Sequence, residues 1–461
     1  MAGSPVSTKK DARRGRWVLV VTILGSSMAF IDGTVVNVAL PAIQRSFAAS
    51  LTDLQWVVEA YALFLSSLLL IGGSLGDVYG RARLFAIGVA LFAGASAACG
   101  FAVSIDQLIA ARAVQGVGAA LLVPESLAIL SASFPPDARG AAIGTWSGFS
   151  AITSAGGPVL GGWLVDHLSW RAAFFINIPI AALVLLILGS KVGAVGGREQ
   201  SRSLDATGSL LITLALGLLV VALLHSSARG WRDPLIIALV VGSAVSFVLF
   251  FRTESRVASP IVPLRLFRSA DFAGANALTL LLYGSLGACF FFLPLNLIQL
   301  QGYSATAAGA ATLPMVGLMF ALSRWSGGLV AKYGSRRPLV VGPVIGGVGY
   351  MMFAMMGVGR SYWTSVFPAV VTLGAGMAVT VAPLTTTVMA AVDDAHAGTA
   401  SGINNAVARM AGLVAIAALG ILIAAADSFA TGFRWIMLTS AALAWSSAAC
   451  AYIAIGRPRV E

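Results

Sequence analysis

Long apolar segments alternate with short polar connections along this chain. Most segments hold about 20 residues with few charges, which is the length that an α-helix needs to cross the hydrocarbon core of a bilayer. The pattern predicts fourteen membrane-spanning helices, at residues 17–40, 54–75, 84–103, 106–131, 141–165, 171–190, 206–224, 234–251, 272–298, 306–331, 338–357, 363–390, 398–424 and 433–455. The predicted fold class is therefore all-α and integral to the membrane, without a separate soluble domain.

The composition agrees with a membrane protein and disfavours several other classes. The 461 residues are 58% hydrophobic and only 10% charged, which leaves too little polar surface to cover a soluble globule. The three cysteines lie in apolar stretches without metal-ligand spacing, so they indicate small buried side chains rather than a metal site. His167, His225 and His396 fall in separate predicted loops, so we expect no catalytic cluster and no enzymatic activity.

Basic residues set the predicted orientation. Of the 29 Lys and Arg residues, 20 fall in loops or tails on the side of the N-terminus, six on the opposite side, and three within or at the ends of spans. The positive-inside rule then places both termini in the cytoplasm, and it explains the net charge of +11 without nucleic-acid binding. Residues 1–16 resemble the start of a signal peptide, but no small-residue cleavage site follows, so we expect an uncleaved first helix.

A faint internal repeat divides the chain. Segments 73–83 (GSLGDVYGRAR) and 327–337 (GGLVAKYGSRR) share a Tyr-Gly step followed by basic residues. Their spacing suggests a transporter with two six-helix halves and its site at their interface, although coincidence in a glycine-rich chain stays open. The predicted parts are a basic cytoplasmic tail (1–16), a first six-helix bundle (17–190), a linker (191–271) with two inserted helices (206–224 and 234–251), a second six-helix bundle (272–455) and a cytoplasmic tail (456–461).

Ionisable side chains inside the predicted spans are the strongest indication of function, because a charge in hydrocarbon is unfavourable unless it is paired or faces water. Asp32, Glu59 and Arg112, in the first, second and fourth spans, reach a similar depth at about 1.5 Å per residue. Two acids and one base leave one acid without a cationic partner, and such an acid can exchange a proton for a cationic substrate. A static polar clasp is the alternative. Glu125, roughly 20 Å deeper, is either a further proton-coupling residue or a solvated side chain in an inward-facing vestibule.

The loop between the second and third spans carries a second set of candidates. Gly73 and Gly80 allow a tight turn, Asp77 can accept hydrogen bonds from a facing helix N-terminus or arginine, and Arg81 and Arg83 anchor the inner face. A bare positive-inside loop would explain the arginines but not Asp77 and the glycine spacing. We therefore predict a conformational latch, or gating loop.

The fifth span contains the run Gly156-Gly157-Pro158-Val-Leu-Gly161-Gly162. A proline among small residues predicts a kink and a close approach between helices. Glycine-rich packing without a functional meaning is the alternative.

Candidate substrate contacts in the second half are less specific. Methionines such as Met315 and Met319, others at 351, 352, 355 and 356, and the aromatic run 290–292 form either a soft wall for apolar ligands or ordinary lipid and helix contacts. Tyr283, Asn296 and Asn276 are polar candidates for the same wall. Asn404 and Asn405 are candidates for hydrogen bonds between helices.

Together these motifs resemble the major facilitator superfamily, and in particular its 14-helix drug:proton antiporter branch. The resemblance rests on Asp32-Gly-Thr-Val-Val-Asn37-Val-Ala-Leu-Pro41, the loop 73–83, Arg112-Ala-Val-Gln115-Gly116-Val-Gly118, the Gly157-Pro158 run, Trp170-Arg171 and Asn177-Ile-Pro179. It implies that Asp32 belongs to the proton-coupling or substrate site, with Asn37 as a further substrate candidate, and that Arg112 serves the coupling network. By the same resemblance Asp77 and Arg81 form the gating latch, and the span-5 glycines form an element associated with antiport.

Several positions depart from that pattern. Thr153 replaces a glycine of the longer antiporter motif, whereas Gly144 fits the earlier one, so antiport is supported incompletely. Glu59 resembles an acid of quaternary-ammonium exporters and favours a cationic substrate. Predicted spans 9 to 14 contain no convincing acid, which favours monovalent or neutral compounds, and Ala331 replaces Asp77 in the second latch.

We expect proton-coupled export of lipophilic, cationic or neutral drugs or toxic compounds by alternating access. A dedicated exporter of one metabolite or self-made antibiotic is the alternative, followed by a nutrient symporter, which the span-5 motif disfavours. The expected energy source is the proton gradient, with no cofactor and no metal. The expected setting is the bacterial inner membrane and its lipid, as a multi-pass monomer that handles small molecules and protons and no nucleic acid.

Overall fold

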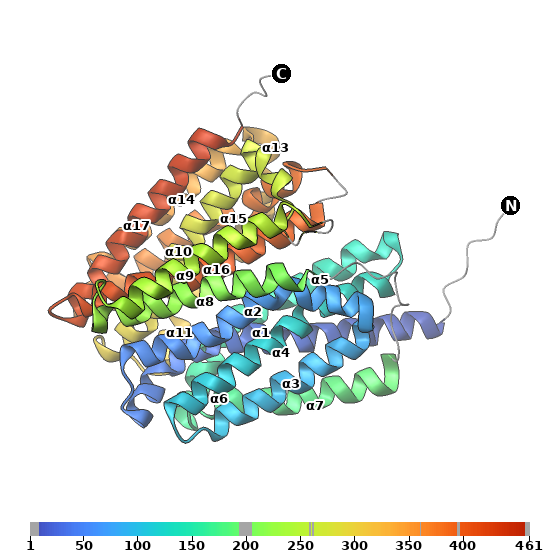
Figure 1. Cartoon of the computed structure of the whole chain (residues 1–461), viewed down its shortest axis with the longest axis horizontal. Helices are drawn as coiled ribbons and strands as arrows, with labels where there is room; N and C mark the ends of the chain where they lie inside the picture. The colour runs from blue at the N-terminus through green and yellow to red at the C-terminus, as the bar shows by residue number, and fades with distance from the viewer. Residues whose placement is uncertain are drawn as a thin grey trace. The chain divides into compact units, whose positions relative to one another are not determined.

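The computed structural model describes residues 9–192, 205–257, 260, 262–359, 361–393 and 397–456, which form helices and contain no strand (Figure 1). The first helices are α1 (Lys9–Phe47), α2 (Leu51–Tyr79), α3 (Arg81–Phe101), α4 (Ile105–Ser133), α5 (Pro136–His167), α6 (Ala172–Phe175), α7 (Asn177–Ile187) and the π-helical turn η1 (Leu188–Val192). Next come α8 (Ala206–Arg229), α9 (Pro234–Glu254), the 3-10 turn η2 (Leu264–Arg268) and α10 (Ala270–Gln299). The last are α11 (Ala305–Ala310), α12 (Leu313–Gly327), α13 (Leu329–Tyr333), α14 (Arg336–Ala354), α15 (Tyr362–Ala390), α16 (Ala397–Ala424) and α17 (Phe429–Ala454).

The chain is an all-helical, multi-pass membrane protein. Within the described residues, 12 helices are long and apolar enough to cross a membrane. The spans expected at 54–75 and 141–165 correspond to α2, of 29 residues, and α5, of 32 residues, but neither helix is among the 12. The expected count of fourteen is therefore not confirmed.

Two expected spans contain short turns but are each long enough to cross a membrane as one helix, Ala172–Val192 and Ala305–Ser323. The sixth is divided into α6, α7 and η1, with Ile176 between the first two helices. The tenth is divided into α11, α12 and α13, and α12 begins with a proline in its first turn. Proline has no backbone N–H to give to the preceding turn, so it favours a helix start at this position.

The chain divides into two compact units. One contains residues 1–42 and 56–209, and the other contains residues 43–55 and 210–461, including most of α8 and all of α9. The predicted domain boundaries stay a prediction, and most of the two predicted tails lies outside the described residues.

Small residues bring the helices of each unit close together. In the first unit, a Cβ on Gly118 of α4 would lie 2.6 Å from the backbone nitrogen of Phe92 on α3. In the second unit, a Cβ on Gly376 of α15 would lie 2.6 Å from the carbonyl oxygen of Gly342 on α14. Contacts of this kind between helix backbones supply the van der Waals attraction that holds helices together in lipid.

Substituting Gly118 with alanine is expected to destabilise the first unit by about 1–3 kcal/mol, because the added methyl group forces α3 and α4 apart. Gly94 on α3 is the matched control, since a Cβ there meets nothing within 4 Å. Gly94→Ala should leave stability unchanged or raise it by up to about 1 kcal/mol through helix propensity. Thermal unfolding in detergent checks both variants, and equal melting temperatures would contradict this packing.

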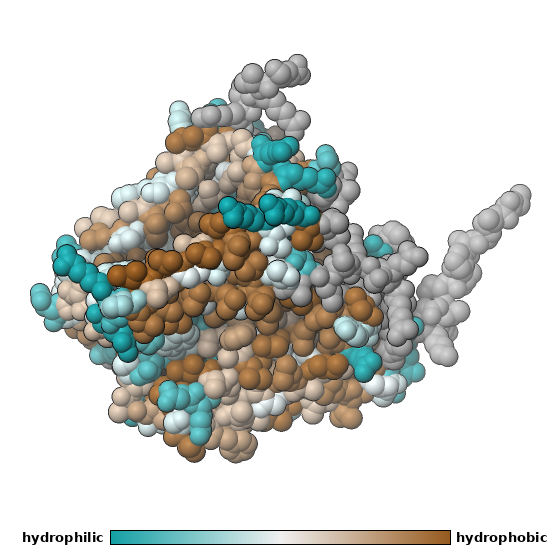
Figure 2. Space-filling view, in the orientation of Figure 1, coloured by the Kyte–Doolittle hydropathy of each residue, from teal (hydrophilic) through white to brown (hydrophobic). Residues whose placement is uncertain are grey.

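The surface agrees with a lipid environment. Large apolar side chains such as Leu186, Phe320 and Trp363 are exposed, and Figure 2 shows hydrophobic residues covering much of the helices on the face drawn, with hydrophilic residues gathered towards helix ends. The cysteines behave as small apolar residues, because Cys99 and Cys289 are buried and Cys450 is half-buried.

Candidate functional site

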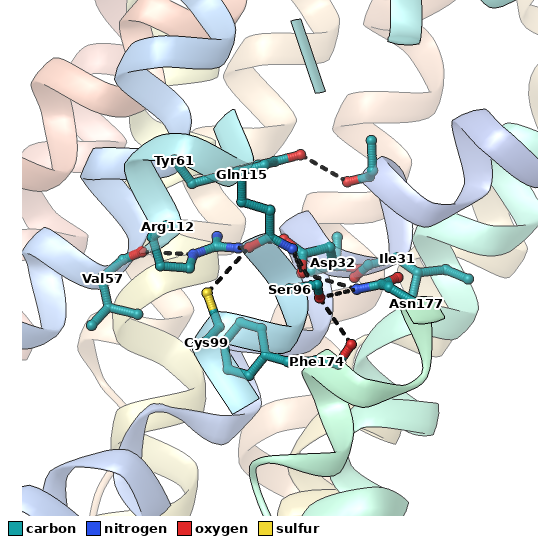
Figure 3. A network of polar contacts seen from close by, with 12 residues as sticks. Ile31, Asp32, Val57, Tyr61, Ser96, Cys99, Arg112, Gln115, Phe174 and Asn177 are labelled. Atoms are coloured by element: carbon teal, nitrogen blue, oxygen red, sulfur yellow. Dashed lines mark hydrogen bonds and ion pairs between the residues drawn. The ribbon is translucent and has the colours of Figure 1, made fainter. Parts of the chain in front are cut away.

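A buried ion pair lies inside the first unit (Figure 3). Arg112 of α4 donates from Nη1 to Oδ2 of Asp32 on α1, and the side chains are 1% and 0% exposed. The structure therefore brings together two of the residues that the sequence places at one depth. Removing either partner would leave an uncompensated charge in a nonpolar environment.

The Arg112 guanidinium makes further contacts that fix its position. Its Nε donates to the carbonyl oxygen of Val57 at 3.0 Å, and its Nη1 donates to Oε1 of Gln115 at 2.7 Å. Its flat face lies 4.2 Å from the centre of the Tyr61 ring, a distance typical of a cation–π contact. Arginine suits this position because its rigid, planar group donates in several directions at once.

Amide and hydroxyl side chains surround Asp32 on the other side. Gln115 Nε2 donates to Asp32 Oδ1 at 2.8 Å and to Ser96 Oγ at 3.2 Å. Asn177 Nδ2 lies 3.0 Å from the same Ser96 oxygen and 3.4 Å from Asp32 Oδ1. The network joins α1, α3, α4 and α7, as the dashed lines in Figure 3 show. Ser96 also donates to the carbonyl oxygen of Phe174 at 2.8 Å, close to the end of α6.

Glu59 lies at the same level of α2 but does not join this network. Arg112 contacts α2 at Val57 and Tyr61, the residues two positions before and after Glu59. The Glu59 side chain is 0% exposed, and neither carboxyl oxygen has a hydrogen-bond partner among the described residues. The geometry thus agrees with one layer along the helices, while the ion pair uses only one of the two acids.

Glu125 is buried rather than solvated. Its side chain is 0% exposed, and a Cβ added to Gly76 of α2 would collide with its carboxyl group. The next residue, Ser126, shares a 2.6 Å hydrogen bond with Ser26 of α1, which also accepts from Trp146 Nε1 at 3.2 Å. The expected alternative of a solvated side chain therefore does not describe this conformation.

The predicted gating loop is very short. Only Gly80 separates α2 from α3, and its φ of 96° lies in the left-handed region that favours glycine. Gly334, in the second copy of the motif, has a φ of 72° between α13 and α14. Gly73 packs against the ring of Pro124 and Arg83 is exposed, whereas the Asp77 side chain lies outside the described residues.

The glycine run of α5 approaches α1 at two positions. A Cβ on Gly157 would collide with Thr34, and a Cβ on Gly161 would lie 3.0 Å from the Cα atom of Val35. Gly144 and Gly156 have nothing within 4 Å of an added Cβ, so they make no such approach. Pro158 lies inside the helix, and Gly162 is buried.

Comparison with known proteins decides the family. The model of the Major Facilitator Superfamily matches residues 22–416. The chain belongs to this superfamily. The matched residues 22–416 contain every motif on which the resemblance rested.

Relatives of this superfamily member include resistance and export proteins. It is 37% identical to "Multidrug resistance protein Stp" of Mycobacterium tuberculosis over 408 residues, covering 88% of this chain and 75% of that protein. It is 33% identical to "Tetracenomycin C resistance and export protein" of Streptomyces glaucescens, covering 90% and 78%. It is also 33% identical to "Methylenomycin A resistance protein" of Bacillus subtilis, covering 96% and 95%.

Solved structures agree on the superfamily fold. A peptide transporter POT in complex with alafosfalin matches with a TM-score of 0.71 at 13% identity, covering 95% of this chain and 94% of that one. A bacterial homolog of the lysosomal transporter Spinster, in an inward-facing conformation, matches with a TM-score of 0.67 at 17% identity, covering 98% of each chain. At these identities the matches establish the fold alone.

The substrate residues expected in this superfamily member do not form one described cavity. Met315 is buried against Gly374, where a Cβ would lie 2.8 Å from the Met315 Cα atom, so it packs helices together. Tyr283 is half-buried, and the side-chain Oδ1 atoms of Asn296 and Asn37 are buried without a hydrogen-bond partner among the described residues. A cavity of about 150 Å³ in the second unit contains none of them; its lining residues are Leu51, Thr52, Gln55, Leu223, Leu224, Ser227, Ala417, Gly420, Ile421, Ile423 and Ala424.

The two asparagines on α16 behave differently. Asn404 Nδ2 donates to Oδ1 of Asn276 at 3.2 Å and to Oγ1 of Thr279 at 2.7 Å, which links α16 to α10 as expected. Asn405 donates instead to the carbonyl oxygen of Ser401 in its own helix at 3.0 Å. Its expected hydrogen bond between helices is therefore wrong in this structure.

Ser96 was not predicted from the sequence, and Gln115 and Asn177 entered only as parts of a motif. Gln115 lies three residues after Arg112, so the two side chains share a helix face, and this spacing is a usable signal. Ser96 lies in a stretch of small residues and gives no such signal, because nothing in its neighbourhood indicates a polar partner.

Proposed function

We propose that this protein exports small lipophilic compounds, cationic or neutral, by alternating access, in exchange for protons that enter the cell. The names of its relatives support resistance by export. The observation that carries the exchange is the contrast between two buried acids. Asp32 is paired with Arg112, whereas Glu59 has no hydrogen-bond partner among the described residues.

The charges of the buried layer suggest different roles for Asp32 and Glu59. The Arg112 charge is balanced by Asp32, so a second negative charge at Glu59 would be uncompensated in a nonpolar environment. A proton removes that charge, and a bound cation balances it. The site therefore favours one positive charge at a time, and we assign proton exchange to Glu59 and the role of fixed counter-ion to Asp32. Glu125, buried further along α4, is a secondary candidate for proton transfer.

The location, orientation and number of spans that we propose are those expected from the sequence. We infer a bacterial inner-membrane protein with both termini in the cytoplasm, acting as a monomer without a cofactor or enzymatic activity. We also infer that α2 and α5 cross the membrane, which would give fourteen spans. The close approach of α5 to α1 at Gly157 and Gly161 supports an antiporter element between these helices.

The test is substrate-dependent proton movement in energised inverted membrane vesicles. Adding ethidium should release protons from the acidified lumen while ethidium accumulates inside, and an ionophore that collapses the proton gradient should stop both. Vesicles without the protein provide the background. Ethidium accumulation that persists after the gradient collapses would contradict antiport.

A dedicated exporter is the second candidate, because two relatives are named for a single antibiotic, tetracenomycin C and methylenomycin A. A panel of lipophilic cations and neutral aromatic antibiotics distinguishes the two candidates. Proton release in response to only one compound would favour a dedicated exporter. Release in response to several unrelated compounds would favour multidrug export.

A further inference from the structure

The connection from α9 to α10, residues 252–271, carries positive charge at the end of a helix with an exposed apolar surface. Val248 and Phe251, in the last turns of α9, are each 51% exposed. Figure 2 shows hydrophobic residues along much of α9 and hydrophilic residues at its ends. The arginines of the connection are all exposed: Arg252, Arg256, Arg265 and Arg268. They therefore begin where the apolar surface of α9 ends.

The two acids of this connection hold backbone groups. Glu254 is 3% exposed, and its Oε2 accepts a hydrogen bond from the backbone nitrogen of Val262 at 3.0 Å. Asp271 is half-buried, and its Oδ1 accepts from the backbone nitrogen of Gly456, after the end of α17, at 2.7 Å. Within the residues that the structure describes, no ion pair involves Arg252, Arg256 or Arg268. The exposed charge of the connection is therefore mainly positive.

The turn η2 gives the connection a buried side and an exposed side. The backbone nitrogen of Leu266 donates to the carbonyl oxygen of Pro263 at 3.0 Å, which closes the turn. Leu266 is 9% exposed, whereas Phe267 is 37% exposed and its ring centre lies 5.0 Å from that of Phe272 in α10. An aromatic ring next to exposed arginines is typical of the boundary between the hydrocarbon and the headgroups of a bilayer.

The connection at the other end of α9 is different. Between α8 and α9, Arg229 Nη1 lies 3.7 Å from Oδ2 of Asp233, whose side chain is 23% exposed. Asp233 also accepts from the backbone nitrogen of Leu235 at 2.8 Å, so it caps the start of α9. Here an acid at the surface offsets part of the positive charge. The two ends of α9 thus both carry arginines but differ in where the acid lies.

We propose that the α9–α10 connection binds the headgroups of anionic phospholipids, with Arg252, Arg256 and Arg268 on the phosphate groups and Phe267 beside the acyl chains. A guanidinium group donates two parallel hydrogen bonds to phosphate oxygens, and clustered basic residues next to a membrane span attract anionic lipid. The exposed apolar surface of α9 next to these charges favours a phospholipid over a soluble anion. This inference goes beyond the proposed export, and the proposed orientation assigns the site to the cytoplasmic leaflet.

Native mass spectrometry of the purified full-length protein tests the proposal, in titrations with phosphatidylglycerol and with phosphatidylcholine of the same acyl chains. The parent should bind phosphatidylglycerol more tightly. The variant that combines Arg252→Gln, Arg256→Gln and Arg268→Gln should bind it on the order of 100-fold more weakly, at about fivefold for each arginine, with phosphatidylcholine unaffected. Higher salt should weaken phosphatidylglycerol binding more in the parent than in this variant, because salt screens exposed charges.

Two control variants separate charge from other effects. Replacing the same arginines by lysine keeps the charge and should retain most of the binding. Combining Arg229→Gln with Arg232→Gln removes arginines from the α8–α9 connection and should leave phosphatidylglycerol binding close to the parent value. Thermal unfolding without added lipid confirms that each variant is folded, as expected for substitutions of exposed residues.

Three results would overturn the inference. They are equal binding of the two lipids by the parent, unchanged phosphatidylglycerol binding in the folded glutamine variant, and displacement of bound phosphatidylglycerol by inorganic phosphate at equal concentration, which would indicate a site for soluble anions. Absence of ethidium-dependent proton release in the parent would instead remove the proposed function, while the lipid site would stand.

Discussion

Arg112→Gln is expected to abolish export and to lower the free energy of unfolding by about 3–5 kcal/mol, the usual effect of removing one partner of a buried ion pair. The variant leaves the Asp32 carboxyl group, which is 0% exposed, without its cationic partner. It also removes the hydrogen bond to Val57 and the contact with the Tyr61 ring, which hold α2 against α4. Thermal unfolding with a thiol-reactive dye measures the loss of stability. The buried Cys99 becomes reactive when the first unit unfolds, and the buried Cys289 becomes reactive when the second unit unfolds.

Two further variants keep this prediction testable if Arg112→Gln fails to fold. Arg112→Lys retains the charge but loses the planar group, so it should be destabilised less and still transport poorly. The double variant Asp32→Asn with Arg112→Gln removes both charges and should recover much of the stability without recovering export. A melting temperature of Arg112→Gln equal to that of the parent would contradict a structural ion pair.

Glu59→Gln is expected to eliminate gradient-driven accumulation while leaving the fold intact. Its carboxyl oxygens have no hydrogen-bond partner among the described residues, so a neutral amide of the same size breaks no described contact. Each proton moved through a difference of 100 mV supplies about 2.3 kcal/mol, so losing one exchanged proton lowers the accumulation of a neutral compound by up to roughly 50-fold. Vesicle accumulation measured with and without the gradient gives this ratio directly.

The matched control lies on the same helix. Asp53 accepts hydrogen bonds from the backbone N–H and the hydroxyl of Ser50 at the exposed start of α2. Asp53→Asn also replaces an acid by an amide, but outside the buried layer, so accumulation should stay near the parent value. If Glu59→Gln accumulates substrate as well as Asp53→Asn does, then Glu59 does not exchange the proton, and Glu125 becomes the next candidate.

The hydropathy pattern determined the helical membrane fold because an apolar segment of about 20 residues in lipid must satisfy its backbone hydrogen bonds internally. The same physics explains why Asp32, Glu59 and Arg112 could be selected from the sequence, since few charges occur in such segments. Depth could also be estimated, because the rise per residue of a helix is constant. The rotation of each helix about its axis could not be estimated from the sequence, because it depends on packing against neighbouring helices.

Two details show what that rotation and packing decide. A one-residue turn at Ile176 separates α6 from α7 inside an apolar segment that is predicted as one continuous span, and the loop at Gly80 has only one residue. Residues such as Ser96 and Asn177 become partners only through helix contacts far apart in the chain, 81 residues in this case. Met315 is the opposite case. Its residue type suits contact with an apolar ligand, but the structure packs it against Gly374.

By itself, the sequence indicated a helical membrane transporter that resembles the major facilitator superfamily, and it predicted a similar depth for three charged residues. Only the tertiary structure decided which acid pairs with the arginine. Asp32 and Glu59 are equivalent in charge and predicted depth, but the orientation of α1 and α2 turns one carboxyl group towards Arg112 and its amide neighbours and leaves the other without a described partner. Side-chain direction around a packed helix is a property of the assembled bundle, and no local pattern in the chain contains it.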